Sequence, residues 1–419
     1  MANLRFEVVA EAFKNDIFER NVYIMSENIL HFEENSRLVP SASGQLDTMG
    51  AAAAGAAVGA AMGGEKGRIC VAHSPSAGAA SIAMAFAAGA ASSGCECVFM
   101  GSCAATSAAY AAGITGCSGG CYVHTEITAS LGLFAWDGLD LYRSTEEQIE
   151  HELTVSHLLP YSHYGTVTNF DGADLIYAAA VSEQVMPFEG IRADFYSSSE
   201  RILSVCEKIL EGRNDKNGER IAFRISGDGR RISAYSEETG YVFRDRLIMI
   251  CCMDMFDRGE DCAVCGSVPR ALEQLAESCG RKIISCGKNI CDDESSPSSQ
   301  CLEARHLASK QLFMHDGIAL AFNVLEVLRR RKMTLKEAVS QLPKFAGVNR
   351  YIPVDKPSEL LERLSVSTGG VLTDGDGGRV TVRPVRTGKG IMLNVESYAL
   401  EAASELCDFY SEVIKRNAY

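Results

Sequence analysis

The sequence lacks the long apolar run that a membrane-spanning helix requires. Its least polar stretch, residues 49–64 (MGAAAAGAAVGAAMGG), is rich in alanine and glycine and falls short of the roughly 20 apolar residues needed to cross a bilayer. We interpret it as a closely packed helix of a soluble protein. The first residues also lack the basic, apolar and small-residue order of a signal peptide, so we expect a cytoplasmic location.

Positive charge is also scarce. The 419 residues carry a formal net charge of −14, with 47% hydrophobic and 22% charged residues. A negative field of this size repels polyanions, which argues against nucleic acid or an anionic membrane as a partner but leaves room for a local basic pocket. The composition is that of a globular chain, and its length predicts roughly two to four domains.

Several common catalytic motifs are missing. The sequence contains no GxxxxGK[ST] P-loop, no GxSxG and no HExxH. A Ser-His-Asp hydrolase built on Ser130 and His124 is also disfavoured. If both residues belong to one strand, six positions apart, they lie roughly 20 Å from each other.

Sixteen cysteines occur mostly in apolar surroundings, which is typical of buried free thiols. Cys262, Cys265, Cys286 and Cys291 have the spacing of two arms of a zinc site. However, the segment around the first two reads as a buried strand, on which they would point to opposite faces. We therefore favour core thiols over zinc.

Alanine-rich helical stretches alternate with short β runs in the first part of the chain. We predict strands at 67–73, 96–102 and 121–130, separated by helices at 77–93 and 104–112. Strands separated by helices predict right-handed crossovers and a parallel sheet. Ser130 would then lie at the carboxyl end of a strand, where such sheets bind ligands.

The same alternation continues less regularly, and from about residue 346 a hairpin, two strands and an amphipathic helix follow. We predict three α/β domains with mixed, mostly parallel sheets flanked by helices, plus a small C-terminal α+β domain. The predicted domains are residues 1–155, 156–250, 251–345 and 346–419.

Residues 127–141 (ITASLGLFAWDGLDL) resemble a loop that reads close to ITASHNPPEYNGIKL in the α-D-phosphohexomutase family, which includes phosphoglucomutases, phosphomannomutases and phosphoglucosamine mutases. The segments STEEQIEHEL, IAFRISGDGRRIS and GGRVTVRP follow in family order, so the resemblance covers most of the chain. It implies an isomerase that moves a phosphoryl group between C1 and C6 of a hexose phosphate, with Ser130 as the phosphoserine. It further implies Mg²⁺, an activator of the glucose 1,6-bisphosphate type, and a monomer or homodimer.

The metal loop of the family, DGDADR, corresponds here to residues 226–231, SGDGRR. Asp228 is the remaining Mg²⁺ ligand and Arg231 matches the terminal arginine, a catalytic position by resemblance. Arg230 replaces the third aspartate. Because Mg²⁺ needs hard oxygen ligands and a like-charge pair costs roughly 4 kcal/mol at 4 Å, we do not expect tight Mg²⁺ binding.

Two interpretations of Arg230 and Arg231 stay open. Their guanidinium groups can meet a phosphate as forked donors and so replace the metal. Alternatively, both are surface charges on a turn.

The sugar loop of the family, GEESGH, falls near residues 302–307, LEARHL. Glu303 and His306 are therefore the candidate substrate contacts that the resemblance implies. His306 is equally consistent with a surface helix residue.

The phosphate loop of the family, RPSGTEP, corresponds to residues 383–389, RPVRTGK. Arg383, Arg386, Thr387 and Lys389 are the candidate phosphate contacts, because cations with a hydroxyl group and flexible glycines suit an anion. A merely basic hairpin is the alternative.

No segment like the family opening FGTSGIRG precedes the alanine-rich helix. These losses predict a phosphohexomutase-like protein whose activity is weakened or lost. The alternative is a non-catalytic pseudoenzyme on the same fold that binds a phosphosugar, another small anion or a protein.

Overall fold

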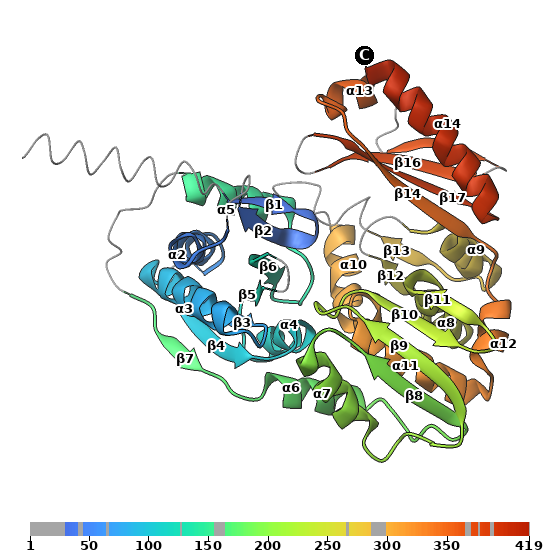
Figure 1. Ribbon diagram of the computed structural model, residues 1–419, viewed down its shortest axis with the longest axis horizontal. Coiled ribbons are helices and arrows are strands. Elements are labelled where there is room, and N and C mark those ends of the chain that lie inside the picture. The colour runs from blue at the N-terminus through green and yellow to red at the C-terminus, as the bar shows by residue number, and fades with distance from the viewer. Residues whose placement is uncertain are drawn as a thin grey trace, which may run out of the picture.

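The computed structural model of the protein (Figure 1) describes residues 30–40, 45–63, 67–125, 128–154, 164–264, 268–285, 299–364, 370–375, 378–385 and 389–418. They form three α/β units followed by a C-terminal α+β unit, which confirms the predicted fold class. The C-terminal unit, red in Figure 1, stands beyond the first and third units, with one helix laid along its sheet.

The first unit is built on a seven-stranded sheet with the order β1-β2-β6-β5-β3-β4-β7. Its strands are β1 (Leu30–Glu33), β2 (Arg37–Pro40), β3 (Arg68–His73), β4 (Glu96–Ser102), β5 (Gly119–His124), β6 (Ser130–Ala135) and β7 (Val167–Asn169). Strand β3 runs parallel to β4 and β5, and β4 runs parallel to β7. The helices α3 (Ala77–Ser92) and α4 (Ala105–Ile114) supply the crossovers that these parallel pairs require.

The single strand predicted over residues 121–130 is wrong. Strand β5 ends at His124 and β6 begins at Ser130, and the two strands are antiparallel. A connection of only five residues permits a hairpin but no parallel crossover. His124 and Ser130 are direct cross-strand partners, so the expected separation of roughly 20 Å is also wrong.

The end of the first unit lies later than the predicted boundary at residue 155. Helix α5 (Arg143–Thr154) leads away from the sheet, and β7 then adds a further strand beside β4. The second unit begins only at α6 (Ala173–Ser182).

The alanine-rich stretch forms α2 (Thr48–Val58) and a short π-helical extension, η2 (Gly59–Gly63), as a closely packed helix. It lies directly against α3 (Figure 1). A Cβ atom at Gly55 would lie 2.0 Å from the Phe86 carbonyl oxygen, and one at Gly89 would lie 1.9 Å from the Ala52 carbonyl oxygen. Glycine is therefore required on both helices for their backbones to touch. In the described part of the chain, no helix combines the length and apolarity needed to cross a membrane.

The second unit contains the sheet β11-β10-β9-β8, in which only β8 and β9 are parallel. The strands are β8 (Ile191–Tyr196), β9 (Glu219–Ile225), β10 (Ile232–Ser236) and β11 (Gly240–Phe243). The turns at residues 226–231 and 237–239 are too short for crossovers, so the sheets are more evenly mixed than the sequence predicts.

One hydrophobic core runs through the second and third units. Phe195 stacks between Phe223 of β9 and Phe322, with ring centroids 5.4 and 5.2 Å apart. The helices that share this core are α6, α7 (Glu200–Leu210), α8 (Arg244–Asp257), α9 (Arg270–Ser278), α11 (Gly317–Arg331) and α12 (Leu335–Ser340). The third unit adds the parallel strands β12 (Cys262–Val264) and β13 (Ile283–Ser285), and α10 (Ser299–Lys310).

The C-terminal unit has its own core between an antiparallel sheet and a helix. The sheet order is β14-β17-β16-β15, with β14 (Ala346–Ile352), β15 (Val371–Gly375), β16 (Gly378–Pro384) and β17 (Ile391–Ser397). Helix α14 (Leu400–Ala418) packs on this sheet, and α13 (Pro357–Arg363) contacts α14.

The contact between α2 and α3 gives a stability prediction. Replacing Gly89 with alanine forces the two backbones apart, and we expect it to lower the free energy of unfolding by about 1–3 kcal/mol. Gly78→Ala is the matched control, because Gly78 lies in the same helix and a Cβ atom added there would meet no other atom within 4 Å. Chemical denaturation measures both, and equal stabilities for the two variants would contradict the close packing.

Candidate functional site

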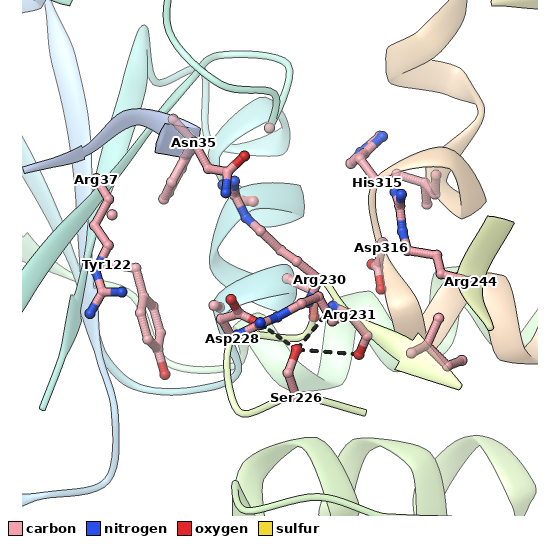
Figure 2. Close-up of a pocket in the computed structure, with 18 of the residues that line it drawn as sticks. Asn35, Arg37, Tyr122, Ser226, Asp228, Arg230, Arg231, Arg244, His315 and Asp316 are labelled. Carbon is pink, nitrogen blue, oxygen red and sulfur yellow. Dashed lines mark hydrogen bonds between the residues drawn. The ribbon is translucent and has the colours of Figure 1, made fainter. Parts of the chain in front are cut away.

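A cavity of about 1730 Å³ lies where all four units meet. Figure 2 shows its wall, with Arg37 and Tyr122 on one side and His315 and Arg244 on the other. Basic side chains from several elements line it: Arg37, Arg224, Arg230, Arg231, Arg244 and Lys310. The C-terminal unit contributes Asn349, Tyr351, Val385 and Met392. Acidic residues line it as well: Glu33, Glu34, Asp137, Asp228, Asp245 and Asp316. The adjacent residues Arg230 and Arg231 are the part of the lining that suits a small anion.

The turn between β9 and β10 occupies the floor of the cavity. The hydroxyl group of Ser226 donates to Asp228 Oδ1, and the backbone N–H of Arg230 donates to the same oxygen at 3.1 Å. Burial alone would raise the pKa of Asp228, but these hydrogen bonds hold it below its usual value. The single carboxylate of this turn is therefore ionised and already satisfied by the protein.

Arg230 reaches from this turn to the first unit. Its Nη1 atom lies 2.6 Å from Oδ1 of Asp140, which follows β6. Arg231 has an exposed side chain on the cavity wall and forms no ion pair within the described part of the chain.

A buried ion pair holds the loop that carries Asp140. Arg305 of α10 donates from Nε and Nη2 to both carboxylate oxygens of Asp137, the second at 2.8 Å, and from Nη2 to the Asp140 carbonyl oxygen at 2.9 Å. The side chains of Arg305 and Asp137 are 3% and 0% exposed. The guanidinium also lies over the ring of Tyr142, 4.3 Å from its centroid. Arg305 thus ties the third unit to the first, and Arg230 ties the second unit to the same loop.

The hairpin of β1 and β2 enters the cavity with Glu33, Glu34, Asn35 and Arg37. Asn35 and Ser36 both adopt left-handed backbone conformations, with φ of 59° and 51°. This conformation is unfavourable for residues other than glycine. The buried Ser36 hydroxyl stabilises it by donating to Glu146 at 2.7 Å and accepting from the Leu141 N–H at 2.8 Å.

Arg37 donates from Nε to the hydroxyl oxygen of Ser130 at 2.9 Å. Ser130 itself is fully buried and does not line the cavity. The predicted nucleophile therefore lies behind an arginine, at the start of a strand.

Two histidines line the cavity in the neutral form. Burial lowers the pKa of both His124 and His315 to about 4, and nearby arginines add to this effect. Nδ1 of His315 is buried and forms no hydrogen bond within the described residues. Asp316, the next residue, caps α11, and burial raises its pKa to about 6, although the Tyr177 hydroxyl and two backbone N–H groups donate to it.

Residues 39–156 match the family described as phosphoglucomutase/phosphomannomutase, alpha/beta/alpha domain I. The chain is 24% identical over 259 residues to a phosphoglucosamine mutase of Thermotoga neapolitana, a match that spans 56% of this chain and 58% of that protein. A phosphoglucomutase/phosphomannomutase family protein of Burkholderia thailandensis has a similar fold, with a TM-score of 0.70 at 14% identity over 93% of this chain and 97% of that one.

The first domain of the chain thus matches the phosphoglucomutase/phosphomannomutase family, and the chain as a whole has a fold similar to a solved member of that family. A further structure with this fold is an N-acetylphosphoglucosamine mutase of Aspergillus fumigatus in complex with GlcNAc-6P and magnesium. It has a TM-score of 0.50 at 10% identity and covers 85% of this chain and 78% of that one.

The residues of this chain do not fit the Mg²⁺ that the family implies. Among the described residues, no group of three or more histidine, cysteine, aspartate or glutamate side chains is arranged to hold a metal. Oδ1 of Asp228 already accepts from the Ser226 hydroxyl and the Arg230 backbone N–H. The positive charge of Arg230 also acts on Asp228, and a guanidinium repels a dication. Of the four cysteines with zinc-site spacing, Cys265, Cys286 and Cys291 lie outside the described residues. Cys262 is buried with its sulfur 3.6 Å from that of Cys252.

The predicted sugar contacts lie on helix α10. Glu303 and His306 lie on the exposed face of α10 and do not line the cavity. The buried face of α10 is formed by Ala304, Arg305 and Ala308, so Glu303 and His306 point outward. The cavity instead receives Ser309 and Lys310 from the end of this helix.

The predicted phosphate loop is only partly described, because Arg386 and Thr387 lie outside the described residues. Arg383 does not line the cavity and forms an ion pair with Glu34 of the hairpin, 2.7 Å between Nη1 and Oε1. Lys389 is exposed, and its carbonyl oxygen accepts from the Tyr351 hydroxyl at 2.5 Å.

The sequence does not predict the hairpin, the Arg305 ion pair or the place of His315. For Arg305, no local pattern indicates its partner 168 positions away.

The buried ion pair gives a second prediction. Asp137→Asn leaves Arg305 without its counter-charge, and we expect the free energy of unfolding to fall by about 3–5 kcal/mol. Asp408→Asn is the control. It removes the carboxylate of an exposed ion pair in which Asp408 Oδ1 lies 2.6 Å from Arg350 Nη1. Denaturant titration tests both. If Asp137→Asn lowers the free energy of unfolding no more than Asp408→Asn does, the ion pair between Asp137 and Arg305 does not hold the units together.

His315 gives a prediction for pH. Between about pH 4 and 6.5 the unfolded chain binds a proton at His315 that the folded protein does not, so this histidine makes stability fall as the pH falls through that window. His315→Gln should reduce the fall in melting temperature across this window, measured against the wild type at each pH. Asp316, with its raised pKa, acts in the opposite direction in both proteins and cancels in the comparison. The exposed His306→Gln should behave like the wild type, and an unchanged profile for His315→Gln would refute the assignment.

Proposed function

We propose that this phosphohexomutase-like protein binds a hexose phosphate in the cavity and that its phosphoryl transfer is weakened or lost. The observation that carries the proposal is the pair of adjacent arginines at the cavity floor, of which Arg230 replaces an aspartate of the family metal loop and Arg231 matches its terminal arginine. Arg230 and Arg231 supply fixed positive charge where a carboxylate set would otherwise gather a cation. Guanidinium groups bind phosphate oxygens through paired, charge-assisted hydrogen bonds, without a metal.

The position of Ser130 supports the loss of turnover. Phosphoryl transfer depends on an accessible, aligned hydroxyl group and on neutralisation of the transferred charge. Ser130 has no exposed surface, and Leu131, which is also fully buried, follows it in the strand. The hydroxyl is therefore poorly placed to reach a sugar in the cavity.

The substrate class rests on the comparisons as well as on the cavity. The curated relative is a phosphoglucosamine mutase, and a structural neighbour was solved with GlcNAc-6P. The matched segment spans less than two thirds of the curated relative, so its activity does not transfer directly. A six-carbon sugar phosphate is the ligand class that agrees best with these relatives and with a cavity lined by arginines and aromatic rings.

Ligand binding is tested by calorimetric titration with glucose 6-phosphate. Arg231→Gln should weaken binding about tenfold, because one charge-assisted contact to phosphate is removed without disturbing another ion pair. Arg416→Gln is the control, since Arg416 is exposed on α14, outside the cavity lining. Absence of binding by the wild type to glucose, mannose and glucosamine phosphates would rule out the proposed ligand class.

One observation favours a second candidate, a slow but active mutase. Arg37 already contacts the Ser130 hydroxyl, and the same guanidinium would neutralise a phosphoryl group placed there. Intact mass spectrometry after incubation with glucose 1,6-bisphosphate separates the two candidates. We expect no added phosphoryl group on the wild type. An added group that Ser130→Ala abolishes, together with isomerisation of glucose 1-phosphate, would establish the mutase instead.

A further inference from the structure

The salt bridge between Arg230 and Asp140 joins two loops at the edge of the cavity. The pair is only partly covered, with side chains 34% and 28% exposed, and Arg230 lines the cavity. In the family patterns given above, the position of Asp140 carries a lysine and that of Arg230 an aspartate. Compared with the family patterns, the positive and negative charges of these two positions are exchanged. The positive charge therefore lies on the turn at the cavity floor.

We propose that the Asp140 carboxylate competes with the ligand's phosphate for the Arg230 guanidinium. When the cavity is empty, the Asp140 carboxylate neutralises the guanidinium. When a phosphorylated ligand binds, Arg230 leaves Asp140 and turns to the phosphate. This inference rests on the proposed function and assigns a role to a residue that does not itself touch the ligand.

The geometry determines which partner moves. The Asp140 carbonyl oxygen is held by Arg305, and the N–H of Leu141 is held by the buried Ser36 hydroxyl at 2.8 Å. The backbone of Asp140 is thus fixed on both sides. Arg230 is anchored to Asp228 at its backbone N–H, and its long side chain, one-third exposed, has the rotatable bonds to turn from one anion to the other.

Electrostatics favour exchange over simultaneous binding. A phosphate that met Arg230 while Asp140 remained paired would lie within a few ångströms of a second anion, where like charges repel. The phosphate offers nearly two negative charges and three acceptor oxygens, against one charge on the carboxylate. A phosphate bound to Arg230 can also contact the adjacent guanidinium of Arg231, whereas Asp140 pairs with Arg230.

A double-mutant cycle tests the competition. Asp140→Asn keeps the size and an acceptor oxygen but removes the charge, so binding of glucose 6-phosphate should tighten about two- to fivefold. In the Arg230→Gln background the same substitution should have no effect, because the contested guanidinium is gone. Asp194→Asn is the matched control, since Asp194 lies 2.6 Å from Arg220 on the second sheet, away from the cavity lining.

Each outcome of the titrations decides the matter. If Asp140→Asn tightens ligand binding equally in the wild type and in the Arg230→Gln background, the effect comes from removing negative charge in general. That result would overturn the proposed competition. Unchanged or weaker binding by Asp140→Asn would overturn it while leaving the proposed function standing. If neither the wild type nor Asp140→Asn binds, both proposals fail together. Melting curves verify folding, and Asp140→Ser replaces the first variant if that one does not fold.

Discussion

A buried ion pair between Asp137 and Arg305 fixes how the units of this protein meet. Both side chains are almost fully removed from water, so each charge needs the other to remain in the interior. Arg305 also holds the Asp140 carbonyl oxygen, and the Asp140 carboxylate in turn holds Arg230. Three units therefore share one chain of contacts around the 137–140 loop, and the cavity takes its shape from that loop.

The turn at residues 226–231 has a different balance of charge from the family pattern, because Ser226 and Arg230 stand where that pattern has aspartates. The chain as a whole is strongly acidic, whereas the cavity lining carries as many basic as acidic residues, among them two adjacent arginines at the 226–231 turn. Within the described ranges, neither Arg231 nor Arg244 forms a salt bridge with a carboxylate, whereas Arg230 shares Asp140. Two adjacent guanidinium groups can hold a dianion without a metal, because they supply both the charge and the hydrogen bonds.

Local pattern predicts much of the fold but little of the site. The packing of α2 against α3 is consistent with the alanine and glycine content of both helices. The N-terminal cap of α11 is consistent with the aspartate that opens residues 316–318, Asp-Gly-Ile. Periodicity assigns Ser130 to the wrong strand because it does not show where a hairpin turns. Counting residues places Glu303 and His306 in the site, whereas the buried face of α10 is formed by Ala304, Arg305 and Ala308. Contacts such as Arg305 with Asp137 depend on the tertiary arrangement and leave no trace in local sequence.

We propose that arginines, in place of a metal, hold the ligand. Calorimetric titration of glucose 6-phosphate in excess chelator and again in excess Mg²⁺ tests it most directly. We predict the same dissociation constant in both conditions, and a loss of affinity when Arg230 and Arg231 are both replaced by glutamine. Binding that requires Mg²⁺ and survives the loss of both arginines would contradict the account.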